Sequence, residues 1–538
     1  MSNVQVDLSV LDAKIARTVF RDMDNPHRWD LTKVPGFMGE RNPDVMSQLE
    51  VIGLEITSKK KFSFNMKDFS NKEILFDTSY RSLILTDKYL EIGIRLPSQI
   101  LFGLGQHNTK FLLSKGNWTM FNRDRSGSPV ATGEGNSQTY GTHPFLMCKT
   151  KANQFIGILF YNSNAQEINI RFASQEKSII TYRTVGGILD IYYFMAGTAD
   201  EVIQNYYNMV GKPSMPPFWG LGFHQSSWLY NNTDDLKEVV KNYLDNDFLF
   251  ETIWADIPYM HNYINFSVNK TSFKGIQKFV QDLHQENRHF VPIIDAGISL
   301  EADGDRINWY KKGRDKGVFM KSAKNSDKYM GNLIGSVWPK HTVFMDYFHP
   351  EATNFWKEGL AHLHDLVPFD GIWIDMNEAS NNCKDEKGEY IGECPPEEDV
   401  NNRDIVKRRL EVKKHKPSFT GEYDSLPYTP DGKPLYVRTL SLDSYHYNPG
   451  GEGEENNYVQ YNTHSLFATL ETMATAEFLK GDEGKKPFII SRASFVGHGQ
   501  YGSIWTGDNS ATDEDLKLSI SQVMQFSMFA IPFTGGDI

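Results

Sequence analysis

Hydrophobic and polar residues alternate along the first 215 residues in the manner of β-strands. Every second residue is apolar in segments 92–96 and 168–172, which is the period of a strand with one buried face. Turns rich in Gly, Asn and Ser separate such segments, and no long helical pattern begins before about residue 198. We therefore predict that residues 1–215 form an antiparallel β-sandwich domain.

The pattern changes after a cluster of prolines at 212–217, which marks a domain boundary. From residue 216, strand-like segments alternate with helical stripes. The clearest stripes lie at 236–244, where Asn232, Thr233 and Asp234 are available to cap the helix, and at 273–283. The predicted strands are 218–224, 248–256, 290–295, the first half of 371–378, 487–492, 503–509 and 531–537.

This β-α alternation predicts a parallel sheet, and the number of units favours an α/β fold of the (β/α)8 TIM barrel type over residues 216–538. Insertions at about 298–346 and 379–460 interrupt the pattern. Loops of this length on a barrel usually shape the substrate cleft. Seven strands are found where a closed barrel needs eight, so we expect the sequence to be cut after the seventh.

Composition narrows the possible partners. The net charge of −12 argues against a nucleic-acid partner, and the basic run at 407–416 is interpreted as a solvated surface. No apolar run approaches the ~20 residues of a membrane span. The first residues lack the basic and apolar regions of a signal peptide, which predicts a cytosolic protein or a missing beginning. The sequence leaves the oligomeric state open.

Three cysteines do not make a disulfide framework. Cys383 and Cys394 lie in one loop and could bridge in an oxidising compartment, a question that the sequence leaves open. Cys148 is predicted to be a small buried side chain. Four N-glycosylation sequons favour secretion only weakly. They are at Asn117, Asn231, Asn265 and Asn269.

Two predicted strands end in an aspartate. Asp375 directly follows Ile-Trp-Ile, and Asp508 follows the strand-like segment Ser-Ile-Trp-Thr-Gly. Taken alone, Asp375 could cap the next helix and Gly-Asp-Asn could be a turn. In (β/α)8 barrels, however, the carboxyl ends of the strands hold the catalytic groups.

The hexapeptide Trp-Ile-Asp-Met-Asn-Glu at 373–378 resembles the signature of glycoside hydrolase family 31, which includes maltase, sucrase-isomaltase and lysosomal α-glucosidases. Segment 505–509 resembles the family's Trp-x-Gly-Asp-Asn motif. The resemblance runs from about residue 101 to residue 538. It implies that Asp375 is the nucleophile and Asp508 the general acid/base of a retaining mechanism, which needs neither metal nor cofactor.

The resemblance also implies a substrate-binding set. Asp256 and Ile257 lie in Trp-Ala-Asp-Ile-Pro-Tyr-Met, where Pro258 replaces a second family aspartate. Without the resemblance, other interpretations hold. The tryptophan of Val-Trp-Pro would be a core residue, the arginine of Ser-Arg-Ala-Ser would form a structural ion pair, and residues 121–124 would form a surface turn. The other expected pocket residues are Asp124, Trp338, Trp373, Met376, Arg492, Trp505 and Asp537.

On this resemblance we expect a retaining α-glucosidase that releases terminal non-reducing glucose from maltose-like oligosaccharides. An endoplasmic-reticulum glucosidase that trims N-glycans, an α-xylosidase, a transglucosylase and a non-catalytic carbohydrate-binding homologue are the alternatives. Gln500 and Ile504 depart from the family pattern, and no family histidine follows Asp537. The family favours a secretory, lysosomal or secreted location. A nucleotide-binding protein is disfavoured because no Gly-rich phosphate loop follows the early strands.

Overall fold

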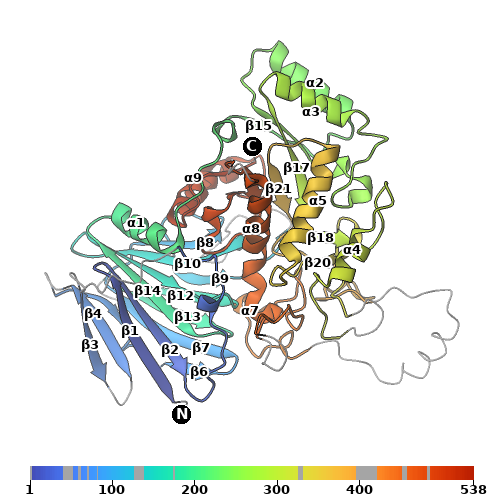
Figure 1. Cartoon of the computed structure of the whole chain (residues 1–538). Helices are drawn as coiled ribbons and strands as arrows, with labels where there is room; N and C mark the ends of the chain where they lie inside the picture. The colour runs from blue at the N-terminus through green and yellow to red at the C-terminus, as the bar shows by residue number, and fades with distance from the viewer. Residues whose placement is uncertain are drawn as a thin grey trace, which may run out of the picture.

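The computed structural model has two parts, a β-sandwich and a curled parallel sheet surrounded by helices (Figure 1). Within the part of the chain that it describes, no helix is both long and apolar enough to cross a membrane. The basic run at 407–416 lies outside that part. The described residues are 3–39, 52–58, 62–68, 72–81, 83–125, 138–173, 176–324, 331–395, 421–450, 457–481 and 485–537.

The sandwich consists of two antiparallel sheets, which confirms the predicted class of this part. The alternating segments 92–96 and 168–172 lie in the same sheet with one strand between them, and Ile94 and Ile168 are fully buried between the sheets. The first sheet has the order β1 (Val4–Asp12), β2 (Ile15–Asp22), β14 (Leu189–Ala196), β11 (Phe155–Phe160), β10 (Gln138–Lys149) and β8 (Leu101–His107). The second has the order β3 (Ile52–Ser58), β4 (Ser63–Asp68), β5 (Ile74–Asp77), β7 (Tyr89–Leu96), β13 (Ser178–Thr184), β12 (Gln166–Phe172) and β9 (Gly116–Met120), with β6 (Ile84–Thr86) paired to β7.

Seven parallel strands follow in chain order, so that each new strand is added beside the previous one. This confirms the barrel-type sheet, although most strands are shorter than the apolar runs that predicted them. An α-helix lies between most consecutive strands, and a short 3-10 helix, His498–Gln500, lies between the fifth and the sixth. The strands are β15 (His224–Gln225), β16 (Thr252–Ala255), β17 (His289–Asp295), β21 (Ile372–Asp375), β22 (Ile489–Ser491), β23 (Ser503–Trp505) and β24 (Thr534–Gly535).

The prediction of a strand over 218–224 was wrong for most of its length. Phe218–Leu221 form a short 3-10 helix, and only His224 of the predicted segment pairs with the sheet. The preceding Pro217 explains the difference, because its carbonyl accepts a hydrogen bond from the Gly220 N–H at 3.0 Å and closes a turn.

The predicted helical stripes are confirmed. Asn232 caps α2, where its side chain accepts hydrogen bonds from the N–H groups of Asp234 and Asp235. Phe279, Val280 and other apolar residues of α3 are buried against the sheet. The helices are α1 (Ala199–Val210), α2 (Thr233–Asp245), α3 (Ile276–Gln285), α4 (Trp309–Lys316), α5 (Ala352–Leu366), α7 (Gln460–Thr463), α8 (Phe467–Lys480) and α9 (Asp513–Met528).

The two insertions have structure of their own. The first contains α4 and a small sheet of three antiparallel strands, β18 (Gly297–Ser299), β20 (Lys340–Phe344) and β19 (Gly335–Val337). In the second, Cys383 and Cys394 form a disulfide bond. Cys148 is free and buried, as predicted.

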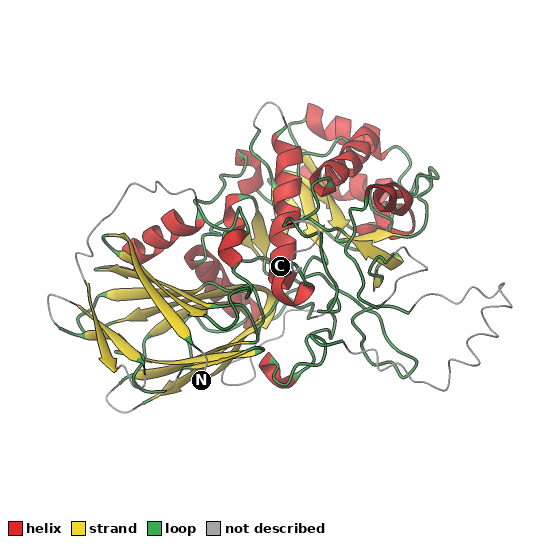
Figure 2. Ribbon diagram, turned by 60° about the horizontal axis from the view of Figure 1, so that its bottom comes forward, coloured by secondary structure: helices red, strands yellow, loops and turns green. Residues whose placement is uncertain are grey.

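One apolar cluster joins the sandwich to the barrel, so the two parts share a core. Figure 2 shows the strands of the sandwich beside the helices and strands of the barrel part. Phe145 and Phe194 of the sandwich contribute to it, as do Phe495 and Phe529 of the barrel part. The ring of His143 also stacks on Phe529, with 4.8 Å between the ring centroids. This junction holds the ends of sandwich strands against the rim of the barrel, where the site described below is located.

Candidate active site

Charged side chains occur at the carboxyl ends of consecutive barrel strands. Asp256 follows β16, Asp295 ends β17, Asp375 ends β21, Arg492 follows β22, and Asp508 lies three residues after β23. Because the strands are parallel and in chain order, all these residues lie at one rim of the sheet. The structure therefore brings the two predicted catalytic aspartates to the same rim.

Asp375 is buried and has two hydrogen-bond or ion-pair partners. Its Oδ1 accepts the Met376 N–H at 2.7 Å and lies 3.1 Å from Arg492 Nε. Burial raises the pKa of Asp375, while the charge of Arg492 opposes the rise. The two contacts favour the ionised form, which a nucleophilic carboxylate requires.

Arg492 is a buried cation shared by several acids. It makes a bidentate pair with Glu378, with N–O distances of 2.8 and 2.9 Å. Its Nη2 is 4.0 Å from Asp124 Oδ2, and its guanidinium lies over the ring of Tyr140 at 4.7 Å. Burial raises the pKa of Glu378 to about 7 in spite of Arg492. Arg492 therefore holds together carboxylates that would otherwise repel one another.

Asp508 lies on the exposed side of the rim. Its Oδ2 accepts a hydrogen bond from the Tyr140 hydroxyl at 3.2 Å, and Tyr140 belongs to β10 of the sandwich. Gly507 has a φ of +86°, and a Cβ at this position would meet the Tyr140 ring at 2.1 Å, so only glycine fits before Asp508. Tyr140 thus connects Asp508 to Arg492 and, through it, to Asp375.

The charges of the two predicted catalytic aspartates also raise the pKa values of the remaining predicted rim acids. Burial raises the pKa of Asp256 to about 6, with the charge of Asp508 as an additional cause, and its Oδ1 accepts the Ile257 N–H at 2.6 Å. The surrounding protein and the charges of Asp508 and Asp375 raise the pKa of Asp537 to about 7. A concentration of negative charge of this kind suits binding of a neutral, hydroxyl-rich ligand that can donate hydrogen bonds.

Aromatic side chains line the barrel below the acids. Trp373 and Trp505 meet edge to face with 5.4 Å between their centroids, and Trp254 is 5.5 Å from Trp373. Trp373 and Asp375 are two residues apart on one strand and therefore face the same side of the sheet. Met376 is buried, has a φ of +56° and places its sulfur 3.2 Å from Arg492 Nη2. A positive φ in a non-glycine residue is a strained conformation typical of functional sites.

Trp338 and Ile257 occupy different environments. Trp338 lies in the turn between β19 and β20, is 40% exposed, and packs edge to face on Trp228 at 4.9 Å. Tyr263 is 6.3 Å from Trp338, so this aromatic group faces solvent rather than the core. The side chain of Ile257 is fully buried in the barrel core.

Asp124 reaches the rim from the sandwich. Its Oδ2 accepts hydrogen bonds from Arg438 Nη2 at 2.5 Å and from Ser380 Oγ at 2.8 Å, both of which belong to the second insertion. Of the two residues that depart from the family pattern, Gln500 donates to the carbonyls of Gly36 and Gly497, and Ile504 lies in the shared core.

Sequence reasoning missed several residues of the rim. Asp295 ends a predicted strand just as Asp375 does, so the signal for it was present. Tyr140 and Arg438 have no local signal, because they reach the rim from the sandwich and from an insertion. Glu471 of α8 is buried and accepts a hydrogen bond from Asn377 at 2.9 Å; on the sequence it is one polar residue in a helix.

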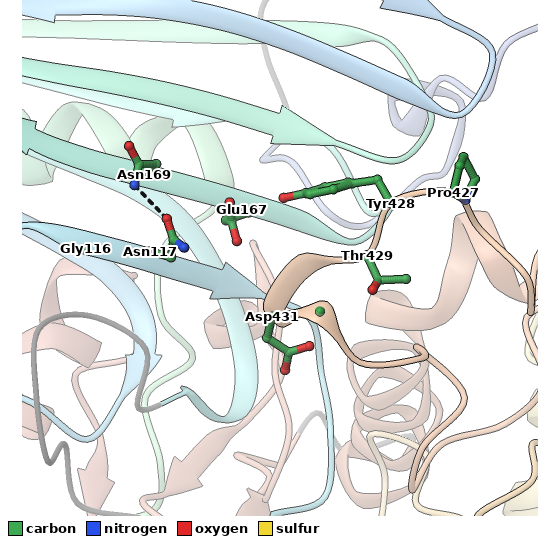
Figure 3. Close-up of a pocket in the computed structure, with 9 residues that line it drawn as sticks. Gly116, Asn117, Glu167, Asn169, Pro427, Tyr428, Thr429 and Asp431 are labelled. Carbon is green, nitrogen blue, oxygen red and sulfur yellow. Dashed lines mark hydrogen bonds between the residues drawn. The ribbon is translucent and has the colours of Figure 1, made fainter.

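A cavity of about 890 Å³ lies between β9, β12 and the segment 427–432 (Figure 3). Its lining includes Asn117, Glu167, Asn169 and Tyr428, and Asn169 donates a hydrogen bond to Asn117 at 2.6 Å. None of its lining residues belongs to the predicted catalytic set, so this cavity is distinct from the rim site.

Comparisons with known protein families identify both parts of the chain. Residues 213–538 match the Glycosyl hydrolases family 31 TIM-barrel domain. The chain belongs to glycosyl hydrolase family 31. Residues 5–169 match the Glycosyl hydrolase 31 N-terminal galactose mutarotase-like domain. The resemblance seen in the sequence motifs is thereby confirmed.

Curated relatives of the family 31 chain include sucrase-isomaltase from Homo sapiens, which is 33% identical over 96% of this chain and 26% of its own length. Lysosomal alpha-glucosidase from Mus musculus is 32% identical over 89% of this chain and 45% of its own length. Alpha-glucosidase from Hordeum vulgare is 32% identical over 89% of this chain and 49% of its own length. The chain thus spans half or less of the length of these relatives.

Solved structures share the fold. The catalytic subunit of ER glucosidase II superposes with a TM-score of 0.77 at 19% identity, covering 100% of this chain and 60% of that chain. The Flavobacterium johnsoniae family 31 dextranase gives a TM-score of 0.74 at 19% identity, covering 100% of this chain and 58% of that chain. At this identity the similarity concerns the architecture of the family 31 chain only.

Proposed function

We propose that this family 31 chain is the catalytic part of a retaining α-glucosidase that removes terminal non-reducing glucose from maltose-like oligosaccharides. The observation that supports this most is the pairing of Asp375 and Asp508 at one rim, linked through Arg492 and Tyr140. Relatives that are 32–33% identical to this chain are named sucrase-isomaltase, lysosomal alpha-glucosidase and alpha-glucosidase, which supports the proposal.

In the proposed first step, an Asp375 oxygen attacks the anomeric carbon while Asp508 gives its proton to the leaving glycosidic oxygen. The bond from carbon to the leaving oxygen breaks as the bond to Asp375 forms. In the second step, Asp508 takes a proton from water, the water oxygen bonds to the anomeric carbon, and the bond to Asp375 breaks. Both aspartates return to their starting states.

The surroundings of the two acids fit these roles. Asp375 is buried and contacts a cation, whereas Asp508 is exposed, where a leaving group and a water molecule can reach it. Asp256, Asp537 and the tryptophans would bind the hydroxyls and faces of the glucose unit. The exposed aromatic group around Trp338 would contact the next sugar.

The test compares wild type with Asp375→Asn and Asp508→Asn on maltose and on p-nitrophenyl α-glucoside, using the full-length gene product. Asp375→Asn should lose activity on both substrates. Asp508→Asn should lose about 10²–10⁴-fold on maltose but less on the nitrophenyl glucoside, whose leaving group needs no proton. Asp315→Asn, at an exposed position on α4, is the matched control.

Other outcomes of these assays would indicate a different function. Faster release from an α-xyloside than from an α-glucoside would indicate an α-xylosidase, and a preference for glucose on N-glycans would indicate a trimming glucosidase. Binding of maltose with no glucose released by wild type would indicate a non-catalytic homologue.

A further inference from the structure

Asp295 is the partner of Asp375 across neighbouring strands. The two residues are in register in the parallel pair of β17 and β21, so their side chains lie on the same face of the sheet. Asn265 fixes the backbone of Asp295, because its Nδ2 donates to the Asp295 carbonyl at 2.6 Å and its Oδ1 accepts the Asp295 N–H at 3.1 Å. The position of the Asp295 side chain beside Asp375 is therefore held firmly.

The carboxyl group of Asp295 differs from that of Asp375 in its contacts. Asp295 is 0% exposed, and neither of its carboxyl oxygens has a hydrogen-bond partner among the described residues. Asp375 accepts the Met376 N–H and contacts Arg492. A buried carboxylate without donors is costly, whereas a neutral carboxylic acid is tolerated far better.

The groups that surround Asp295 favour the neutral form. Burial raises its pKa most, and the negative charges of Asp375, Asp256 and Glu471 raise it further. Arg492 is the cation that acts in the opposite direction, and it is already paired with Glu378 and Asp375.

The charged groups around Asp295 come from different strands and helices. Asp375 comes from β21, Asp256 from the end of β16, Glu471 from α8 and Arg492 from the end of β22. From the 3-10 helix Ile257–Tyr259, Tyr259 donates its hydroxyl to the Ile293 carbonyl at 2.9 Å and gives no hydrogen bond to Asp295.

We propose that Asp295 is a positioning residue that keeps the proton of the Asp295–Asp375 pair, so that the negative charge of the pair resides on Asp375. This rests on the proposed function only in its consequence, which is that a neutral Asp295 leaves Asp375 ionised and ready to attack. An ionised Asp295 would instead push a proton onto Asp375 and disable it.

The decisive experiment measures stability and needs no substrate. Asp295→Asn is nearly isosteric and always neutral, so its urea midpoint and that of wild type are compared between pH 5 and 7. If Asp295 is neutral in the native state, wild-type unfolding releases its proton, since the unfolded aspartate has a pKa near 3.9. As the pH rises from 5 to 7, the unfolding equilibrium constant of wild type should then increase relative to that of the variant by about tenfold per pH unit.

A difference between the two proteins that does not change with pH would overturn the proposal, because the Asp295–Asp375 pair would then hold no proton in the native state. Comparing Asp375→Asn with Asp375→Asn/Asp295→Asn then assigns the proton, because Asp295 is the one member of the pair left to titrate. The same tenfold change per pH unit in this comparison supports the proposal, and a difference that does not change with pH overturns it. Asp245→Asn, on the exposed face of α2, controls for general effects of pH. Asp295→Leu, which is apolar and of similar size, is the second variant. Failure of both Asp295 variants to fold would also overturn the proposal, since neutral replacements of a neutral, unpaired group should be accepted.

The pH dependence of kcat/KM gives a second test if the glucosidase activity is found. With Asp295 neutral, Asp295→Asn should leave the acidic limb, which reports ionisation of Asp375, within about half a pH unit of wild type. If Asp295 were charged, removing its charge would move that limb toward acid by about one unit or more, contrary to the proposal. Absence of glucosidase activity would refute the proposed function while the stability experiment still decided the state of Asp295.

Discussion

Replacing Arg492 with Met removes the buried cation that Glu378, Asp375 and Asp124 share. Glu378 loses a bidentate pair at 2.8 and 2.9 Å, and Asp375 loses a contact at 3.1 Å. Removing one partner of a buried ion pair typically costs about 3–5 kcal/mol, because the other charge stays buried without compensation. We expect Arg492→Met to destabilise the barrel by this amount at pH 7.5.

The loss of stability caused by Arg492→Met should be larger at high pH than at low pH. With Arg492 present, the pKa of Glu378 is already raised to about 7, and the pKa of Asp375 is also raised. Without Arg492 both pKa values rise further. Above pH 7 the variant must keep protons that wild type releases, which adds up to about 1.4 kcal/mol per pH unit for each carboxyl group. Below about pH 6 both proteins hold these protons, and the deficit shrinks.

Urea unfolding of wild type, Arg492→Met and the double variant Arg492→Met/Glu378→Gln at pH 5.5 and 7.5 tests this reasoning. Barrel tryptophans such as Trp373 and Trp505 supply the fluorescence signal. The double variant should recover part of the stability, because Gln carries no charge. Equal stability of the two variants at pH 7.5, or a deficit of the single variant that is the same at both pH values, would refute the ion-pair account.

Three further outcomes follow from particular contacts. Cys383→Ser should lower stability by about 3 kcal/mol through loss of the cross-link over 11 positions, and dithiothreitol should destabilise wild type but not the variant; equal sensitivity to reductant would contradict this. Asn265 should carry no glycan after expression through a secretory pathway, since its buried amide binds the Asp295 backbone; a glycopeptide at Asn265 in folded protein would disprove it. Arg438→Met should raise KM for maltose about tenfold with kcat changed less, because Asp124 loses a charged hydrogen bond; steady-state kinetics with unchanged KM would count against a substrate role for this loop.

The sequence could predict those parts of the site that lie at strand ends. A short apolar run followed by an aspartate places that side chain at the rim of a barrel, and this rule located Asp375 and Asp508. The same rule applied to Asp295 would have found it as well. The first barrel strand was misjudged, since an apolar segment after Pro217 turned into a 3-10 helix.

Other contacts depend on tertiary packing and have no local pattern. Tyr140 lies in a buried sandwich strand, and its contact with Asp508 exists only because the shared core docks the sandwich on the barrel. Arg438 lies in an irregular insertion and meets Asp124, which is 314 positions away in the chain. Such pairs cannot be read from hydrophobic periodicity, which reports local burial alone.

In the proposed mechanism Asp375 forms a covalent bond to the sugar. Incubation of the full-length gene product with a mechanism-based cyclitol epoxide, followed by proteolysis and mass spectrometry, tests it directly. We expect a single adduct on the peptide that contains Asp375, formed in step with loss of activity and absent from Asp375→Asn. An adduct on another carboxylate, or inactivation that leaves Asp375 unmodified, would contradict it.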